Sequence, residues 1–260
     1  MRILITFALE NEFAPWRAMH AFEKSRWCGE EAYFSEVGAA ELGVILTGVG
    51  PRRAGLAAAN VMRSESRSID ACISAGLAGA LKSEYRIGQV LAARQVISEA
   101  KRAECPDRLI PGSELLLSIA DRHGATVVDR FYTAERMVIS ANDKRRLGAE
   151  ADAVEMESFE ILLESRAFGV PAVAIRAISD LVDEDLPLDL NRVLTGEGEI
   201  SVPRVLGQVA MSPAAIPGLI RLEKQSRTAA GDLAKFLDSY VLAVAAQPTA
   251  SFTTMAAAVR

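Results

Sequence analysis

The chain has 260 residues, 50% of them hydrophobic, which is enough to bury the core of one large domain, and no Ser-, Gly- or Pro-rich linker divides it. Its 29 Lys and Arg residues are dispersed among 34 Asp and Glu residues, so a formal net charge of −5 gives no electrostatic footprint for a nucleic-acid partner. Three cysteines without a C-x-x-C pair and only 2 histidines provide no zinc-ligand spacing, and we expect no metal and a reducing compartment.

The first predicted element is a strand over residues 3–8, and the acidic residues that follow it also bear on localisation. Glu10 and Glu12 interrupt the apolar run too early for the core of a signal peptide. No stretch of the chain approaches the roughly 20 apolar residues that a membrane span needs. We therefore expect a cytoplasmic protein.

Apolar, β-branched runs alternate with helical patterns along the first 180 residues. The predicted strands cover residues 3–8, 33–37, 42–47, 71–75, 89–97, 151–154 and 172–178. The predicted helices cover residues 12–22, 51–62, 113–123 and 156–167. This rhythm predicts an α/β fold with some antiparallel pairing.

The pattern changes after residue 180. Residues 183–189 form an acidic loop, and the remainder predicts helices broken by Pro203, Pro213 and Pro217, with no strand. We therefore predict a single domain over residues 1–246, in which residues 201–246 are a C-terminal helical extension. Residues 247–260 show no period and are expected to be a disordered tail.

Acidic clusters follow three of the predicted strands. Glu155 and Glu157 come after one strand and Asp180 after the next, and the crevice outside the carboxyl ends of strands is where open α/β sheets bind ligands. Glu12 follows the first strand. Each of these residues alone also suits the first turn of a helix, where the dipole favours acidic side chains. Carboxylates that converge in one crevice repel and shift one another's pKa values, which is typical of an enzyme.

Two glycine segments accompany these clusters. Residues 48–51 read as a turn and a helix start, but they lack the Lys-Ser pair of a phosphate loop. Asp70 also begins the next strand rather than ending it, which favours a backbone-lined pocket wall over dinucleotide binding. Residues 74–80 have too little side chain to fill a core, so they form either a simple turn or a place where a ligand or another backbone approaches closely.

Three carboxylates at one site suit a particular reaction. One can deprotonate water, one can accept two hydroxyl hydrogen bonds from a sugar, and one can protonate a leaving group. Together they describe cleavage of an N-glycosidic bond. Two carboxylates alone would equally suit an ordinary glycosidase.

The chain resembles the nucleoside phosphorylase I superfamily, which includes purine nucleoside phosphorylases and methylthioadenosine/S-adenosylhomocysteine nucleosidases. The resemblance spans roughly residues 3–185. Its motifs are residues 8–12, 48–50, 76–79, 154–158 and 176–180. It implies a three-layer α/β/α sandwich with a mixed central β-sheet and extra C-terminal helices, in a homo-oligomer.

The resemblance also implies roles for individual residues. Glu12 would activate the attacking water, and Glu157 would accept the ribose hydroxyls while Met156 packs on the ribose. Asp180, helped by Ser179, would protonate the purine at N7, which requires a protonated carboxyl near neutral pH and so predicts apolar surroundings. The other substrate-binding residues that the resemblance implies are Glu155, Gly76, Leu77 and Gly50.

Two departures concern the nucleophile. Leu77 stands where the family has a serine that helps to hold phosphate or water, and Ser74 stands where its phosphorylases carry an arginine. The missing phosphate-binding arginine could be replaced by Arg52, Arg53 or Arg176. Hydrolysis is therefore favoured, with no cofactor expected and phosphate retained as a possible co-substrate.

Within the superfamily the chain is most similar to the hopanoid-associated phosphorylase group, through residues 76–79, 183–192 and 213–240. This similarity implies release of adenine from adenosylhopane in hopanoid biosynthesis. Residues 214–220 are apolar and are followed by Arg221, Lys224 and Arg227, which suits either a membrane-facing patch for a polycyclic lipid or helices packed on the sheet or on another subunit.

Other activities stay open at this point. A methylthioadenosine/S-adenosylhomocysteine nucleosidase or a purine nucleoside phosphorylase would use the same three carboxylates. A non-catalytic nucleoside-binding or lipid-binding protein would not need all of Glu12, Glu157 and Asp180, although Leu77 is compatible with it. The base pocket should lie between Phe131 and Asn142, without its residues being identified.

Overall fold

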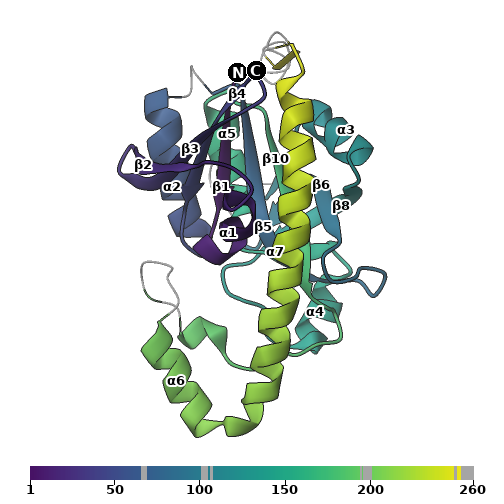
Figure 1. Cartoon of the computed structure of the whole chain (residues 1–260). Helices are drawn as coiled ribbons and strands as arrows, with labels where there is room; N and C mark the ends of the chain where they lie inside the picture. The colour runs from purple at the N-terminus through teal and green to yellow at the C-terminus, as the bar shows by residue number, and fades with distance from the viewer. Residues whose placement is uncertain are drawn as a thin grey trace.

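The computed structural model describes residues 1–65, 69–100, 105, 108–193, 195, 201–248 and 251–252. Over these residues ten strands form one mixed sheet with helices on both faces, which confirms the three-layer α/β/α expectation (Figure 1). The strands are β1 (Arg2–Phe7), β2 (Glu23–Trp27), β3 (Glu30–Val37), β4 (Ala40–Leu46), β5 (Ala71–Ala80), β6 (Val90–Ser98), β7 (Leu109–Pro111), β8 (Thr126–Thr133), β9 (Ala153–Glu155) and β10 (Ala172–Asp180). The helices are α1 (Glu10–Arg17), α2 (Pro51–Glu65), α3 (Glu114–Arg122), α4 (Ala141–Leu147), α5 (Ser158–Ala167), α6 (Val202–Met211) and α7 (Ile216–Ala245), with 3-10 turns η2 (Leu190–Arg192) and η3 (Pro213–Ala215).

Side-chain alternation along the central strands builds a core on each face of the sheet. In β1, Ile3, Ile5 and Phe7 pack with α1, α3 and α7, whereas Leu4 faces α2 and α5. Successive residues of a strand point to opposite faces, so an apolar run of this kind is buried on both sides. Each helical layer therefore has its own hydrophobic core, and the sheet between them is rigid.

The strand order is β10-β6-β8-β9-β5-β1-β4-β3-β2, and β5 also pairs with β10. Strands β1, β5 and β10 run parallel, so their carboxyl ends meet at one edge of the sheet. β9 runs antiparallel to β5 and parallel to β8. Within β5, its partners are Gly79 and Ala80 at the end of the strand. The residues that follow β9 therefore lie at the same edge of the sheet.

The predicted five-residue strand at 71–75 is too short, and the glycine segment after it is not a loop. β5 continues to Ala80, because neighbouring strands pair with its backbone along both edges. Ladder pairing on both edges outweighs the low strand propensity of glycine. The segment is therefore part of a strand, and its missing side chains make room for other groups.

Several elements were missed or misplaced. β2 is an edge strand with exposed polar residues, and α4 has only 7 residues, so neither gives a periodic apolar signal; β7 and β8 were also missed. The first helix ends at Arg17, not at residue 22, because the chain turns there into β2. Pro203, Pro213 and Pro217 do not break helices but occupy their first turns, where a missing N–H costs little.

The C-terminal helices form two parts. From Ala229 onward α7 buries an apolar face against the sheet, whereas the described side chains of α6, η3 and residues 216–228 are not buried. This second part, which we call the helical arm, extends past the edge of the sheet (Figure 1). No helix among the described residues is long and apolar enough to cross a membrane.

The last predicted segment is only partly covered. Residues 249–250 and 253–260 of the expected tail lie outside the described residues, so the prediction for them stays a prediction. Phe252, which lies within that segment, is 3% exposed and packs in the core beside α7.

Candidate active site

A cavity of about 650 Å³ opens at the edge where β1, β5 and β10 end. Its lining brings together Glu12, Glu157 and Asp180, the three carboxylates that the sequence singled out. The other predicted site residues in the lining are Leu77, Glu155, Met156 and Ser179. Gly50 contacts Glu157 and Gly76 lies against Glu12. The predicted convergence of acidic strand ends is therefore present in the fold.

Glu12 is held at the start of α1 by three backbone N–H groups. Its Oε2 accepts from Ala8 at 3.0 Å and Leu9 at 3.2 Å, and its Oε1 accepts from Leu77 at 3.2 Å. A Cβ on Gly76 would lie 3.4 Å from both carboxylate oxygens, so the glycine lets β5 approach this group closely. Burial raises the pKa of Glu12 above its ordinary value, although Arg176 and the backbone donors oppose the rise. A raised pKa makes this carboxylate a stronger base than one on the surface.

Glu157 stands at the N-terminus of α5, where it faces two other carboxylates. Its Oε1 accepts from the N–H of Gly50 at 2.9 Å, and its Oε2 lies 3.7 Å from Nη2 of Arg176. Burial, with Glu155 and Glu12 nearby, raises the pKa of Glu157 to about 8. A carboxyl with this pKa holds its proton across most of the neutral range, and hydroxyl groups that donate to it would favour its ionised form.

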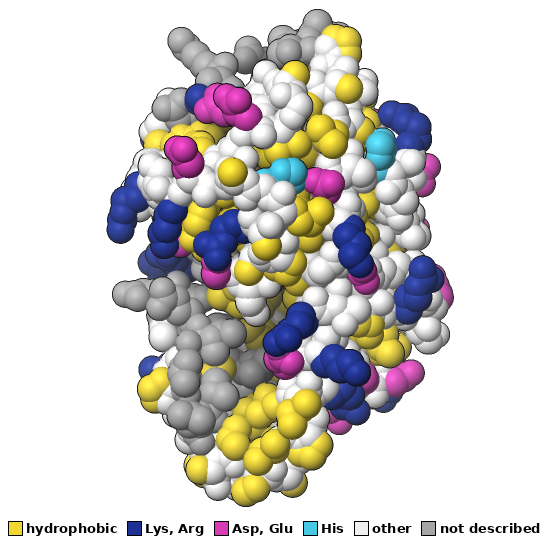
Figure 2. All heavy atoms as spheres, in the orientation of Figure 1, with side chains coloured by type: hydrophobic (Ala, Val, Ile, Leu, Met, Phe, Trp, Pro, Cys, Tyr) yellow, Lys and Arg dark blue, Asp and Glu magenta, His cyan; other side chains and the backbone are white. Residues whose placement is uncertain are grey.

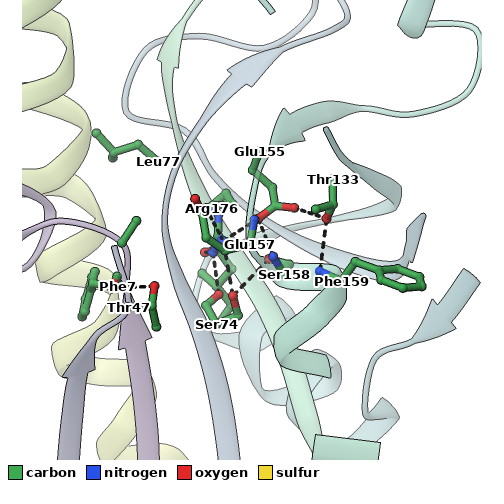
Figure 3. Close-up of polar contacts among 12 residues, drawn as sticks. Phe7, Thr47, Ser74, Leu77, Thr133, Glu155, Glu157, Ser158, Phe159 and Arg176 are labelled. Atoms are coloured by element: carbon green, nitrogen blue, oxygen red, sulfur yellow. Dashed lines mark hydrogen bonds and ion pairs between the residues drawn. The ribbon is translucent and has the colours of Figure 1, made fainter. Parts of the chain in front are cut away.

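Glu155 is saturated by the protein. Its Oε2 accepts from Arg176 at 2.6 Å and from the N–H groups of Glu157 and Ser158, and its Oε1 accepts from the hydroxyl of Thr133 (Figure 3). The guanidinium also donates to the carbonyl oxygen of Ser74 at 2.8 Å. This buried pair fixes the start of α5, and the substrate contact assigned to Glu155 stays a prediction.

Asp180 ends β10 at a point where the strand register against β5 shifts, and such a bulge re-aims a side chain. Its Oδ2 accepts from the hydroxyl of Ser179 at 2.9 Å, and its Oδ1 accepts from the ammonium group of Lys144. A Cβ on Gly79 would lie 2.9 Å from Oδ1, so only glycine fits beneath this carboxylate. The predicted apolar surroundings are therefore wrong, because a buried cation contacts Asp180.

The remaining lining separates into two regions. Residues 136–138, inside the predicted interval of the base pocket, line the cavity, and nothing in their sequence marked them. Leu219 and Leu222 of the helical arm also line the cavity, as do Leu9 and Pro15. Leu77 lies apart from the polar network of Arg176 (Figure 3). None of the three candidate cations is in the described lining, but Arg176 contacts Glu155 and Glu157 from behind the cavity.

The environment of Glu157 predicts an effect on stability. An unfolded glutamate titrates near 4.5, whereas the native group keeps its proton to about 8. The native state therefore binds more protons between these values, and the free energy of unfolding falls as pH rises through this window. Glu157→Gln removes that fall, so the variant should be more stable than the wild type by a few kcal/mol at pH 9 and nearly equal to it at pH 4.5.

Thermal unfolding of both proteins across pH measures this difference. Glu114→Gln, at the first turn of α3 on the exposed surface, is the matched control and should follow the wild-type curve. Parallel curves for Glu157→Gln and the wild type would show that Glu157 is ionised in the native state throughout.

Known proteins share this architecture. An aminodeoxyfutalosine nucleosidase of Campylobacter jejuni is 23% identical over 224 residues, which cover 79% of this chain and 97% of that protein. A futalosine hydrolase mutant of Helicobacter pylori superposes with a TM-score of 0.71 at 20% identity, covering 93% of this chain and 98% of that one. A 5'-methylthioadenosine/S-adenosylhomocysteine nucleosidase from Neisseria meningitidis, in complex with methylthio-immucillin-A, gives 0.71 at 21% identity over 93% and 98%.

The structural likenesses establish the fold, and the family follows from the sequence itself. The family model described as the phosphorylase superfamily matches residues 2–197, a span that contains every strand and all three carboxylates of the cavity. The chain belongs to the phosphorylase superfamily.

Proposed function

We propose that this chain is a nucleosidase that cleaves the N-glycosidic bond of an adenosine-type nucleoside and releases adenine. The observation that supports it most is the set of three carboxylates in one cavity, each held in a different environment. The relatives and structural neighbours named above are nucleosidases and a hydrolase of such nucleosides.

The three environments suit three tasks. Glu12, anchored by backbone donors, takes a proton from the attacking water. Glu157 releases its proton to solvent when the ribose hydroxyls bind to it, and the negative charge that remains stabilises the oxocarbenium-like transition state. Asp180, which is paired with Lys144, takes up a proton from solvent and, with Ser179, delivers it to N7 of the leaving base. Met156 packs on the ribose.

Water is the nucleophile that the cavity supports better. The guanidinium of Arg176 is committed to Glu155 and Ser74, so it is not available to hold a phosphate dianion. Leu77 offers only its backbone N–H near Glu12, and that N–H already donates to the carboxylate. Among the described residues, Arg136 and Arg227 also line the cavity, so phosphorolysis would need one of them to hold the phosphate.

Adenosylhopane is the substrate that we favour, because apolar residues of the helical arm line the cavity and others are exposed on the same arm. Leu219 and Leu222 of the arm line the cavity, and Met211, Ile216 and Ile220 are exposed on it. Figure 2 shows hydrophobic side chains gathered at the lower end of this face, with Lys and Arg just above them. An apolar patch beside basic residues suits contact with a membrane that carries the lipid substrate.

A second candidate is a small-molecule nucleosidase that acts on methylthioadenosine, S-adenosylhomocysteine or aminodeoxyfutalosine. The structural comparisons favour it, because they align over more than 90% of this chain with enzymes of that kind. These substrates need the same base and ribose contacts and differ at the 5' substituent, which would meet Leu219 and Leu222.

One assay separates these possibilities. Adenine release is measured from adenosylhopane, methylthioadenosine and aminodeoxyfutalosine, each with and without phosphate. We expect turnover without phosphate and the highest kcat/KM with adenosylhopane. No release from any of them would overturn the enzyme assignment, and a phosphate requirement would overturn hydrolysis. A preference for methylthioadenosine would select the second candidate.

Assembly and membrane contact are separate parts of the proposal. We expect a homo-oligomer in the cytoplasm that contacts membranes peripherally through the helical arm. Light scattering measures the mass in solution, and a monomer would contradict the first part. Co-sedimentation with vesicles of anionic lipid tests the second, and Ile220→Asp, which places a charge on the exposed patch, should weaken it.

A further inference from the structure

Lys144 is a buried lysine that none of the steps above uses. It lies on α4 and is 1% exposed, whereas Arg145 and Arg146 beside it have side chains 53% and 76% exposed. Lysine is almost never fully buried unless it is paired, because removing an ammonium group from water costs several kcal/mol. Its burial therefore calls for a specific set of partners.

Those partners are three oxygen atoms at the end of β10. The ammonium group donates to Oδ1 of Asp180, to the carbonyl oxygen of Leu181 at 3.0 Å and to that of Glu184 at 2.9 Å. An ammonium group has three N–H donors, so every one of them has an acceptor in this cluster. Lys144 thus ties the carboxylate to the turn that follows it.

This turn is held from other directions as well. The N–H of Ala141 at the start of α4 donates to Asp185 at 2.7 Å, and the N–H of Leu186 donates to Ile139 at 2.9 Å. From α7, the side chain of Gln225 donates to Glu184 at 3.0 Å. Lys144 is the buried member of this set and the one that contacts Asp180.

The two oxygens of Asp180 are consequently fixed by different groups. Lys144 contacts Oδ1, which lies against Gly79 of β5 in the space that a Cβ would occupy, while Ser179 contacts Oδ2. The carboxylate cannot rotate about its Cβ–Cγ bond without losing one of these contacts. An ion pair that served only stability would be equally effective away from the cavity, whereas Asp180 lines it.

We propose that Lys144 is a positioning residue for departure of the base: it holds Asp180 in the orientation from which the carboxyl transfers a proton to N7. This inference rests on the proposed function. It predicts that Lys144 acts on turnover through Asp180 alone, and leaves ribose binding at Glu157 untouched.

A double-mutant cycle tests this on the full-length chain. Lys144→Met keeps the length of the side chain and should lower kcat for adenine release by roughly 10- to 100-fold, with KM within about threefold of wild type. In the Asp180→Asn background the same change should lower kcat by less than about twofold, because the group that Lys144 orients is already gone. Additive losses, or a loss confined to KM, would overturn the proposal.

The design also covers failure to fold. Lys144→Met leaves Asp180 as a buried unpaired charge, which is destabilising, whereas the double variant removes both charges. If the single variant is unfolded, turnover by the double variant is compared with that of Asp180→Asn, and a value more than about threefold lower would overturn the proposal. Arg145→Met, which breaks the exposed pair with Asp183 on the same helix, should leave kcat unchanged. A wild-type enzyme that releases no adenine would overturn the proposed function, and this inference with it.

Discussion

Asp180→Asn will lower kcat for adenine release by about a thousandfold, with KM changed by less than about threefold. Adenine leaves poorly as an anion, and a positioned general acid contributes roughly 10²- to 10⁴-fold to such a step. Asparagine keeps the shape of the side chain, and its carbonyl oxygen can still accept from Lys144 and leave the backbone of β10 in place. The variant therefore removes the transferable proton with little change to the pocket.

Steady-state kinetics with the best nucleoside measures this effect, and titration calorimetry with the same variant measures binding. Asp183→Asn is the matched control, because Asp183 lies three residues further along, has a side chain 70% exposed and is outside the cavity lining. It should retain wild-type kcat. Unchanged turnover in Asp180→Asn would refute the role in protonation, and a parallel loss of binding would point to a structural role instead.

The sequence predicted the three carboxylates because their position is a local property. Each follows a strand whose apolar run is easy to recognise, and parallel strands such as β1 and β10 end at the same edge of a sheet. The same reasoning predicted the position of Glu157 correctly, although the strand before it does not run parallel to β5. Glu157 reaches the cavity because β9 pairs, antiparallel, with the last two residues of β5.

Long-range pairing could not be predicted in this way. Lys144 sits in the run Lys144-Arg145-Arg146, which has the pattern of a solvated helix face, and its partner is 36 residues away. Arg176 lies inside an apolar strand, where a buried guanidinium is unexpected without Glu155 opposite it. Glu155 and Asp180 thus each have a cationic partner that tertiary structure brings to them and that the local sequence does not show.

The glycines of β5 likewise combine a feature that the sequence shows with one that only the fold shows. The sequence marks residues 74–80 as small, which predicts close approach of something. What approaches are carboxylates of the chain itself: Glu12 lies over Gly76, and Asp180 lies over Gly79. The identity of these neighbours depends on strand register, which composition does not encode.

Glu12→Gln should lower kcat by about 10²- to 10⁴-fold, because glutamine cannot take the proton of the attacking water. The change also removes an acid limb from the pH profile. In the wild type Glu12 must be ionised to act as a base, and burial raises its pKa above the ordinary value of 4.5. Wild-type kcat/KM should therefore fall on acidification while the pH is still above 4.5. Ionisation of Glu157 adds its own fall in both proteins, so the residual rate of the variant should lack only the part that Glu12 contributes.

Glu10→Gln is the control that isolates this effect, because Glu10 lies on the same first turn of α1 and pairs with Arg17 at 2.7 Å, outside the cavity. Loss of the turn itself would lower the activity of both variants. The two residues differ in burial and in contact with β5, since only Glu12 receives the N–H of Leu77. A wild-type rate in Glu10→Gln with a large loss in Glu12→Gln thus assigns the effect to a base in the cavity, and equal rates in the two variants would leave water without an activating group.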